Sequence, residues 1–165
     1  MLVEGSNGTT VSLRPERWQY PPDAGAWDDQ WLVISGTVNL GARNWSFTLP
    51  CLVMGEAREL ATWLGKATRG EVELRTAADH DDEPSLSFME PHLGFSLTAS
   101  DGEELVLRID FTAAAAPPWL REDVPDGDQY AVELRLRADR LRTAAETWTR
   151  ELDALPSRSF ASTDT

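Results

Sequence analysis

The sequence has few of the residues that catalysis and crosslinking require. It contains one cysteine, Cys51, and two histidines, His80 and His92. A lone cysteine forms no disulfide within the chain, which favours a reducing compartment. The chain has no phosphate-binding loop, no dinucleotide fingerprint, no H-E-x-x-H pattern and no G-x-S-x-G pattern. We therefore predict a protein that is not an enzyme and that uses no cofactor.

Long apolar runs are also missing. The longest are short, such as Ala113 to Ala116, and a bilayer-spanning helix needs about 20 apolar residues. The first residues, Met1-Leu2-Val3-Glu4, have neither the basic region nor the apolar region of a secretory signal. We expect a cytoplasmic protein with no membrane partner.

Acidic residues are abundant. The 165 residues include 28 Asp and Glu against 15 Lys and Arg, which gives a net charge of −13. Phosphate contacts need a basic face, so the charge argues against a nucleic-acid partner. The length and the 41% of hydrophobic residues suit one globular domain. We predict a single domain over residues 1–156 and a polar, disordered tail over 157–165.

Alternating apolar residues predict antiparallel strands with one buried face. In the segment 105–111, for example, apolar residues alternate with Arg108 and Asp110. The other expected strands are short ones at 2–3, 10–13 and 86–88 and further ones at 31–40, 44–49, 93–97 and 130–136.

Two segments change to a helical period. Apolar residues at 60, 63, 64 and 67 predict a helix over 56–67, and a longer stripe predicts a second helix over 139–155. No βαβ alternation occurs. We predict an α+β fold in which a meandering antiparallel sheet of about six to eight strands carries two helices on one face.

Three connections concentrate the negative charge, at 23–29, 79–90 and 122–128. Acidic loops suit a cationic protein partner, and tryptophan is enriched at binding hot spots. The candidate partner interface is therefore acidic with one aromatic anchor. It consists of Asp28, Asp29, Asp79, Asp81, Asp82, Glu83, Trp119, Glu122, Asp123, Asp126 and Asp128.

Two other uses of these residues stay open. The run His80-Asp81-Asp82-Glu83, together with Glu90 and His92, offers ligands for a divalent cation, although the regular spacing of a calcium loop is absent. The alternative function is therefore a domain that binds a small ligand or a metal through the acidic loops. A hydrolase that uses Cys51 or a carboxylate pair is a third hypothesis, which requires a base near the reactive group.

An ordered set of motifs resembles a known family. The set begins with Trp27-Asp28-Asp29-Gln30-Trp31-Leu32-Val33 and Trp45-Ser46-Phe47, and continues with Pro50-Cys51-Leu52 and Trp63-Leu64. It ends with Phe88-Met89-Glu90-Pro91-His92-Leu93-Gly94-Phe95, Phe111 and Pro117-Pro118-Trp119. In this order and spacing, the motifs resemble the WapI family of bacterial immunity proteins over residues 11–156.

The resemblance implies a function. Members of this family are thought to protect a bacterium from the C-terminal toxin domain of a polymorphic toxin delivered by cell contact, in contact-dependent inhibition. The type member guards against a toxin that cleaves tRNA. The resemblance thus implies a cytoplasmic antitoxin that occludes a basic, nuclease-type toxin domain stoichiometrically. It leaves open whether the protein is a monomer or a homodimer.

Overall fold

The computed structural model describes residues 1–22, 28–75, 83–99, 104–123 and 129–158. Two four-stranded antiparallel sheets appear in this part of the chain, each with its strands in sequence order. Sheet A comprises β1 (Leu2–Glu4), β2 (Thr10–Trp18), β3 (Trp31–Asn39) and β4 (Asn44–Val53). Sheet B comprises β5 (Leu86–Ser87), β6 (Leu93–Ala99), β7 (Glu104–Thr112) and β8 (Gln129–Arg137).

A long helix follows the last strand of each sheet. The helix α1 (Met54–Thr68) continues from β4, and α3 (Ala138–Asp153) continues from β8. The order of four strands and a helix therefore occurs twice. Short helical segments complete the described chain, namely η1 (Asp28–Gln30), η2 (Ala113–Ala115) and α2 (Pro118–Asp123).

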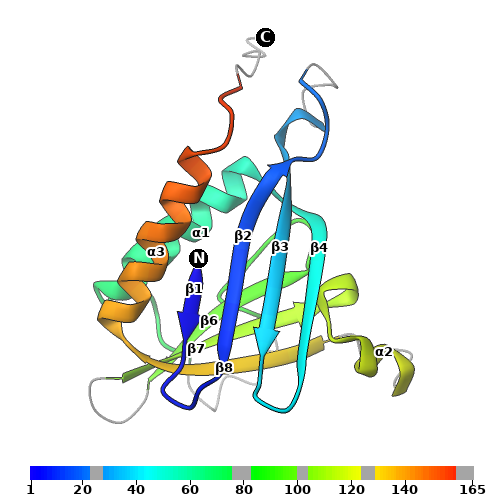
Figure 1. Cartoon of the computed structure of the whole chain (residues 1–165). Helices are drawn as coiled ribbons and strands as arrows, with labels where there is room; N and C mark the ends of the chain where they lie inside the picture. The colour runs from blue at the N-terminus through cyan, green and yellow to red at the C-terminus, as the bar shows by residue number, and fades with distance from the viewer. Residues whose placement is uncertain (23–27, 76–82, 100–103, 124–128, 159–165) are drawn as a thin grey trace.

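The two sheets pack across each other, and the two long helices lie side by side next to them (Figure 1). The predicted α+β class, the eight strands and the two long helices are confirmed. The strands form two sheets instead of one continuous meander. The reason is that α1 carries the chain away from the edge of β4, so that β5 begins a new sheet.

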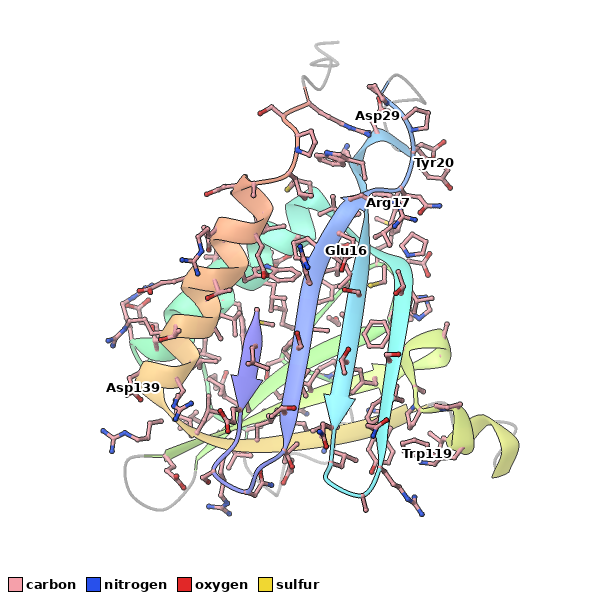
Figure 2. The ribbon with its side chains drawn as sticks, in the orientation of Figure 1. Glu16, Arg17, Tyr20, Asp29, Trp119 and Asp139 are labelled. Atoms are coloured by element: carbon pink, nitrogen blue, oxygen red, sulfur yellow. The ribbon has the colours of Figure 1, made fainter. Side chains whose placement is uncertain are left out.

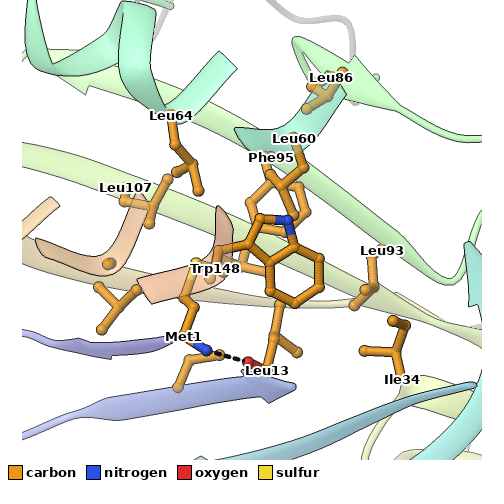
Figure 3. Close-up of a cluster of buried hydrophobic side chains, with 14 of the residues drawn as sticks. Met1, Leu13, Ile34, Leu60, Leu64, Leu86, Leu93, Phe95, Leu107 and Trp148 are labelled. Carbon is orange, nitrogen blue, oxygen red and sulfur yellow. Dashed lines mark hydrogen bonds between the residues drawn. The ribbon is translucent and has the colours of Figure 1, made fainter. Parts of the chain in front are cut away.

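The core lies between the sheets and the helices, and Trp148 of α3 is central to it. Its side chain is fully buried, and its indole N–H donates to the carbonyl oxygen of Ala57 in α1 at 2.8 Å. Figure 3 shows it among residues of both helices and both sheets, including Leu60, Phe95 and Leu13. The bond satisfies the one polar atom of a large apolar side chain, which fixes the two helices against each other.

The register of β4 against β3 is held by a close contact of an aromatic ring with a glycine. Gly36 and Phe47 face each other across the two strands. A Cβ atom at Gly36 would lie 2.1 Å from Cζ of Phe47, so the ring occupies the space that any other residue would fill. Phe47 also packs on Phe111 of sheet B with ring centroids 6.1 Å apart. This residue therefore holds β4 to its neighbour and sheet A to sheet B.

Candidate partner-binding surface

Trp119 packs α2 against both sheets. Its ring meets Trp45 of β4 edge to face at 5.5 Å and Tyr130 of β8 at 6.3 Å. The guanidinium of Arg43 lies 5.6 Å from its ring centroid, within the range of a cation–π contact. The side chain is half-buried and lies near the start of β4 (Figure 2). Trp119 thus has a structural role, and its partly exposed ring remains accessible to a partner.

The anchored helix carries two of the predicted acidic residues. Glu122 and Asp123 form the end of α2, so these two positions are helical and do not belong to a loop as the sequence suggested. The aromatic packing of Trp119 stabilises this short helix. The pattern of polar residues in the sequence does not reveal that packing. Asp126 and Asp128 follow outside the described residues.

The acidic connection near residue 80 is only partly described. Glu83 is exposed and precedes Pro84, whose ring packs over Gly94 of β6. Asp79, Asp81 and Asp82 lie outside the described residues. The ends of this connection are attached to sheet B, because the amide of Arg75 donates to the carbonyl oxygen of Leu97 at 2.8 Å.

The third acidic connection is partly neutralised by the chain itself. Asp28 is exposed, whereas Asp29 is half-buried with its carboxylate 3.8 Å from Nη1 of Arg158. Arg158 also donates to the carbonyl oxygens of Asp29 and Tyr20 and stacks over Trp18 at 4.4 Å. Nothing in the sequence pattern indicated this contact, which lies 129 residues away along the chain. Asp29 therefore offers a partner less charge than Asp28 does.

Cys51 has the properties of a core residue. It is fully buried in β4, and burial raises the pKa of its thiol to about 12, with a further contribution from the carboxylates of Glu56 and Glu90. Only the thiolate is nucleophilic, so the group is inert at neutral pH. His92 instead lies 3.9 Å from the Glu90 carboxylate and 3.4 Å from the carbonyl oxygen of Thr112. This arrangement argues against the thiol hydrolase hypothesis.

Glu56 joins two of the sequence motifs and was missed by sequence analysis. One carboxylate oxygen accepts the amide of Val53 at 3.0 Å, at the start of α1. The other accepts the amide of Met89 at 2.7 Å, in the turn before β6. The motif around Cys51 and the motif around Pro91 therefore meet through one acidic side chain. Sequence distance hides this contact, because the two partners are 33 residues apart.

The described ranges contain neither a cluster of metal-binding side chains nor a membrane-spanning helix. There, no three His, Cys, Asp or Glu side chains are grouped so that they hold a metal ion. In the same ranges, no helix combines the length and the apolar character needed to cross a bilayer. A cation site formed by 79–82 would lie outside the described residues.

Comparison with known proteins gives one family match. The Immunity protein WapI-like family matches residues 1–156. No curated protein matches. Among solved structures, the chain is similar to one titled "Structure of the plant transcriptional regulator PBF-2", with 12% identity and a TM-score of 0.37. That similarity covers 91% of this chain and 77% of the other.

Proposed function

Because the chain belongs to the WapI-like immunity protein family, we propose that it neutralises the C-terminal domain of a polymorphic toxin in the bacterial cytoplasm. The proposed partner is a basic domain of the nuclease type, delivered by cell contact. The proposed mechanism is stoichiometric occlusion without a covalent step.

The net charge of −13 is the observation that carries this proposal. A domain that cleaves nucleic acid must hold phosphates, so it presents a basic surface. A strongly acidic protein attracts such a surface over long distances and raises the association rate, most of all at low ionic strength. The exposed Asp28 and Glu83 and the acidic end of α2 are the charged groups that we propose for this encounter. They lie at more than one place on the molecule, because Asp29 and Trp119 are at opposite ends of sheet A (Figure 2).

The state of the chain's nucleophile supports a binding role. The buried thiol of Cys51 stays protonated at neutral pH. The protonated thiol is not a nucleophile, which supports a proposed mechanism without a covalent step at this residue.

The test measures association of the protein with the C-terminal domain of its cognate toxin. A large secreted protein encoded immediately upstream of the gene would be the candidate for that toxin. Reversing Asp81, Asp82 and Glu83 to lysine replaces three negative charges by three positive ones and changes the charge of one connection by six units. We expect the association rate to fall at least about tenfold at low salt, with a weaker dependence on salt. Surface plasmon resonance across a salt series measures both quantities.

A matched control reverses Glu59 of α1 with Glu146 and Asp153 of α3, which are exposed and change the net charge equally. We expect less than about a threefold change in the rate for this variant. Equal effects of both variants would assign the attraction to net charge and remove the connection from the interface. Failure of the wild-type protein to bind the domain would refute the proposed function. Calorimetry with calcium, magnesium and zinc tests the metal alternative, which predicts heat of binding and a raised melting temperature.

A further inference from the structure

The edge strand β4 lacks charge over its whole length. Residues 44–55 contain no Asp, Glu, Lys or Arg, although a quarter of the chain is charged. Charges on an exposed edge prevent unwanted pairing with other strands, and natural proteins use them for that purpose. An uncharged edge in so acidic a protein therefore has no charges that oppose pairing with a strand of another protein.

The ladder with β3 directs alternate backbone groups of β4 outward. The amide of Leu40 donates to the carbonyl oxygen of Arg43 at the turn between β3 and β4, and bonded pairs alternate from there along the ladder. Trp45 and Phe47 therefore bond to β3, whereas Asn44, Ser46 and Thr48 direct their amides and carbonyls away from it. In the described part of the chain, no backbone hydrogen bond joins these three residues to another segment.

The side chains along the first half of β4 alternate between buried and exposed. The buried indole of Trp45 donates to the carbonyl oxygen of Ala115 at 3.0 Å, and the segment η2 therefore contacts β4. Asn44, Ser46 and Thr48 have exposed side chains. Pro50 ends the available stretch because it has no amide to donate. Phe47 keeps the strand in a fixed register, so the edge is a rigid template.

Charge decides between the possible occupants of this edge. A second copy of the chain would bring together two molecules of charge −13, which repel each other. A cationic protein is attracted instead. The acidic end of α2 follows Trp119, which packs on Trp45, and α2 lies beside the start of β4 (Figure 1). We infer that the outer edge of β4, from Asn44 to Thr48, pairs with an extended strand of the cationic toxin domain through backbone hydrogen bonds. This inference rests on the proposed function.

The experiment compares two substitutions at one position. Ser46→Pro removes an outward-facing amide and places a ring against the incoming strand, and proline is tolerated on an edge. Ser46→Ala removes only the hydroxyl. We expect Ser46→Pro to raise the Kd for the toxin domain at least about tenfold, and Ser46→Ala to change it less than about threefold. Thermal unfolding shows whether each variant is folded.

Amide hydrogen exchange of the wild-type protein gives a second readout that needs no substitution. We expect the amides of Ser46 and Thr48 to exchange fast in the free protein and to become protected in the complex. The amide of Phe47 should be protected in both states because it bonds to β3.

The outcomes separate this inference from the proposed function. A complex that forms with unprotected Ser46 and Thr48, and with full affinity for Ser46→Pro, overturns the edge pairing and leaves the proposed function intact. Absence of any complex overturns both. Protection of Ser46 and Thr48 in the free protein at high concentration, with a dimer in sedimentation, would assign the edge to a second copy.

Discussion

The strands β4 and β8 hold the same place in the two halves of the molecule but differ at their surfaces. Each is the last strand of its sheet and leads into a long helix. The exposed positions of β8 include Glu133, Arg135 and Arg137, and the carbonyl oxygen of Arg135 accepts the amide of Ser6 at 2.7 Å. The exposed positions of β4 carry only amide, hydroxyl and proline side chains. The architecture thus tolerates a charged edge, so the neutral edge of β4 is not a requirement of folding.

The outer faces of the two sheets also differ in the side chains that they carry and in the contacts of those side chains. On sheet B, the nearly buried carboxylate of Asp110 accepts hydrogen bonds from Arg108 at 2.9 Å and from Gln129 at 3.1 Å. Pro84 packs over Gly94 on that sheet. On sheet A, the row formed by Ser12, Thr37 and Ser46 carries short hydroxyl side chains, and Ser35 on the same face donates to the carboxylate of Glu16. The described contacts on the outer face of sheet A thus join exposed side chains, whereas those of sheet B include a buried carboxylate.

Phe47→Ala is the substitution that should disturb this comparison most. The ring covers Gly36 and packs on Phe111, so its loss removes contacts within sheet A and between the sheets. We expect the free energy of unfolding to fall by about 3 kcal/mol, near the lower end for a buried phenylalanine because β4 lies at an edge. Urea denaturation measures the loss.

The matched control is Leu134→Ala on β8, where the side chain is fully buried. Amide hydrogen exchange should then differ between the two strands in each variant. Phe47→Ala accelerates exchange in β4 and leaves β8 protected, and Leu134→Ala has the opposite pattern. Uniform acceleration in both strands for both variants would show that the edges do not open independently.

The sequence predicts the elements of this fold better than their assembly. Alternation in 105–111 and the stripe that includes Trp148 identify β7 and α3, because each pattern reports burial of one face. The division into two sheets follows from where α1 directs the chain, which no local pattern encodes. The same limit applies to the site. Acidic residues are visible in the sequence, whereas the pairing of Asp29 with Arg158 depends on contacts between distant segments. The charge-free run at 44–55 was visible too, and becomes informative only once β4 proves to be an edge.

β4 contains Cys51, whereas β8 contains no cysteine. The titration of this buried thiol shows how well β4 is shielded from water. Burial raises the pKa of Cys51 to about 12 from the ordinary 9.0. Below pH 9 the thiol is protonated in both states and its contribution to stability is complete. As the pH rises from 9 towards 12, the unfolded chain releases the proton and the folded chain keeps it. We therefore expect the free energy of unfolding to fall by up to about 1.4 kcal/mol per pH unit from this group.

Chemical denaturation between pH 8 and 11 measures this decline, and Cys51→Ala supplies the reference. The variant should lose the part of the decline that comes from the thiol. Labelling with a thiol reagent at pH 8 should be slow in the folded wild type and faster after Phe47→Ala. An identical pH profile for wild type and Cys51→Ala would mean that the thiol is not closed off from water.

Exchanging the character of the two edges should have the smallest effect on stability and the most specific effect on binding. Ser46→Glu with Thr48→Arg places charges on β4 like those of β8 and leaves the net charge at −13. Both side chains are exposed, so we expect the free energy of unfolding to change by less than about 0.5 kcal/mol. Affinity for the toxin domain should fall, because charges on an edge oppose the approach of another strand.

The reciprocal variant, Glu133→Thr with Arg135→Thr, makes β8 resemble β4 at the same net charge. It should bind the toxin domain as the wild type does, because the amide of Ser6 already reaches the outer side of β8 at Arg135. Isothermal titration of both double variants therefore tests whether the neutral edge has a function or is merely tolerated. Equal affinity of the two variants would mean that the two edges do not differ in binding the toxin domain. Loss of affinity in the β4 variant alone would locate binding at β4, which has no charged residues.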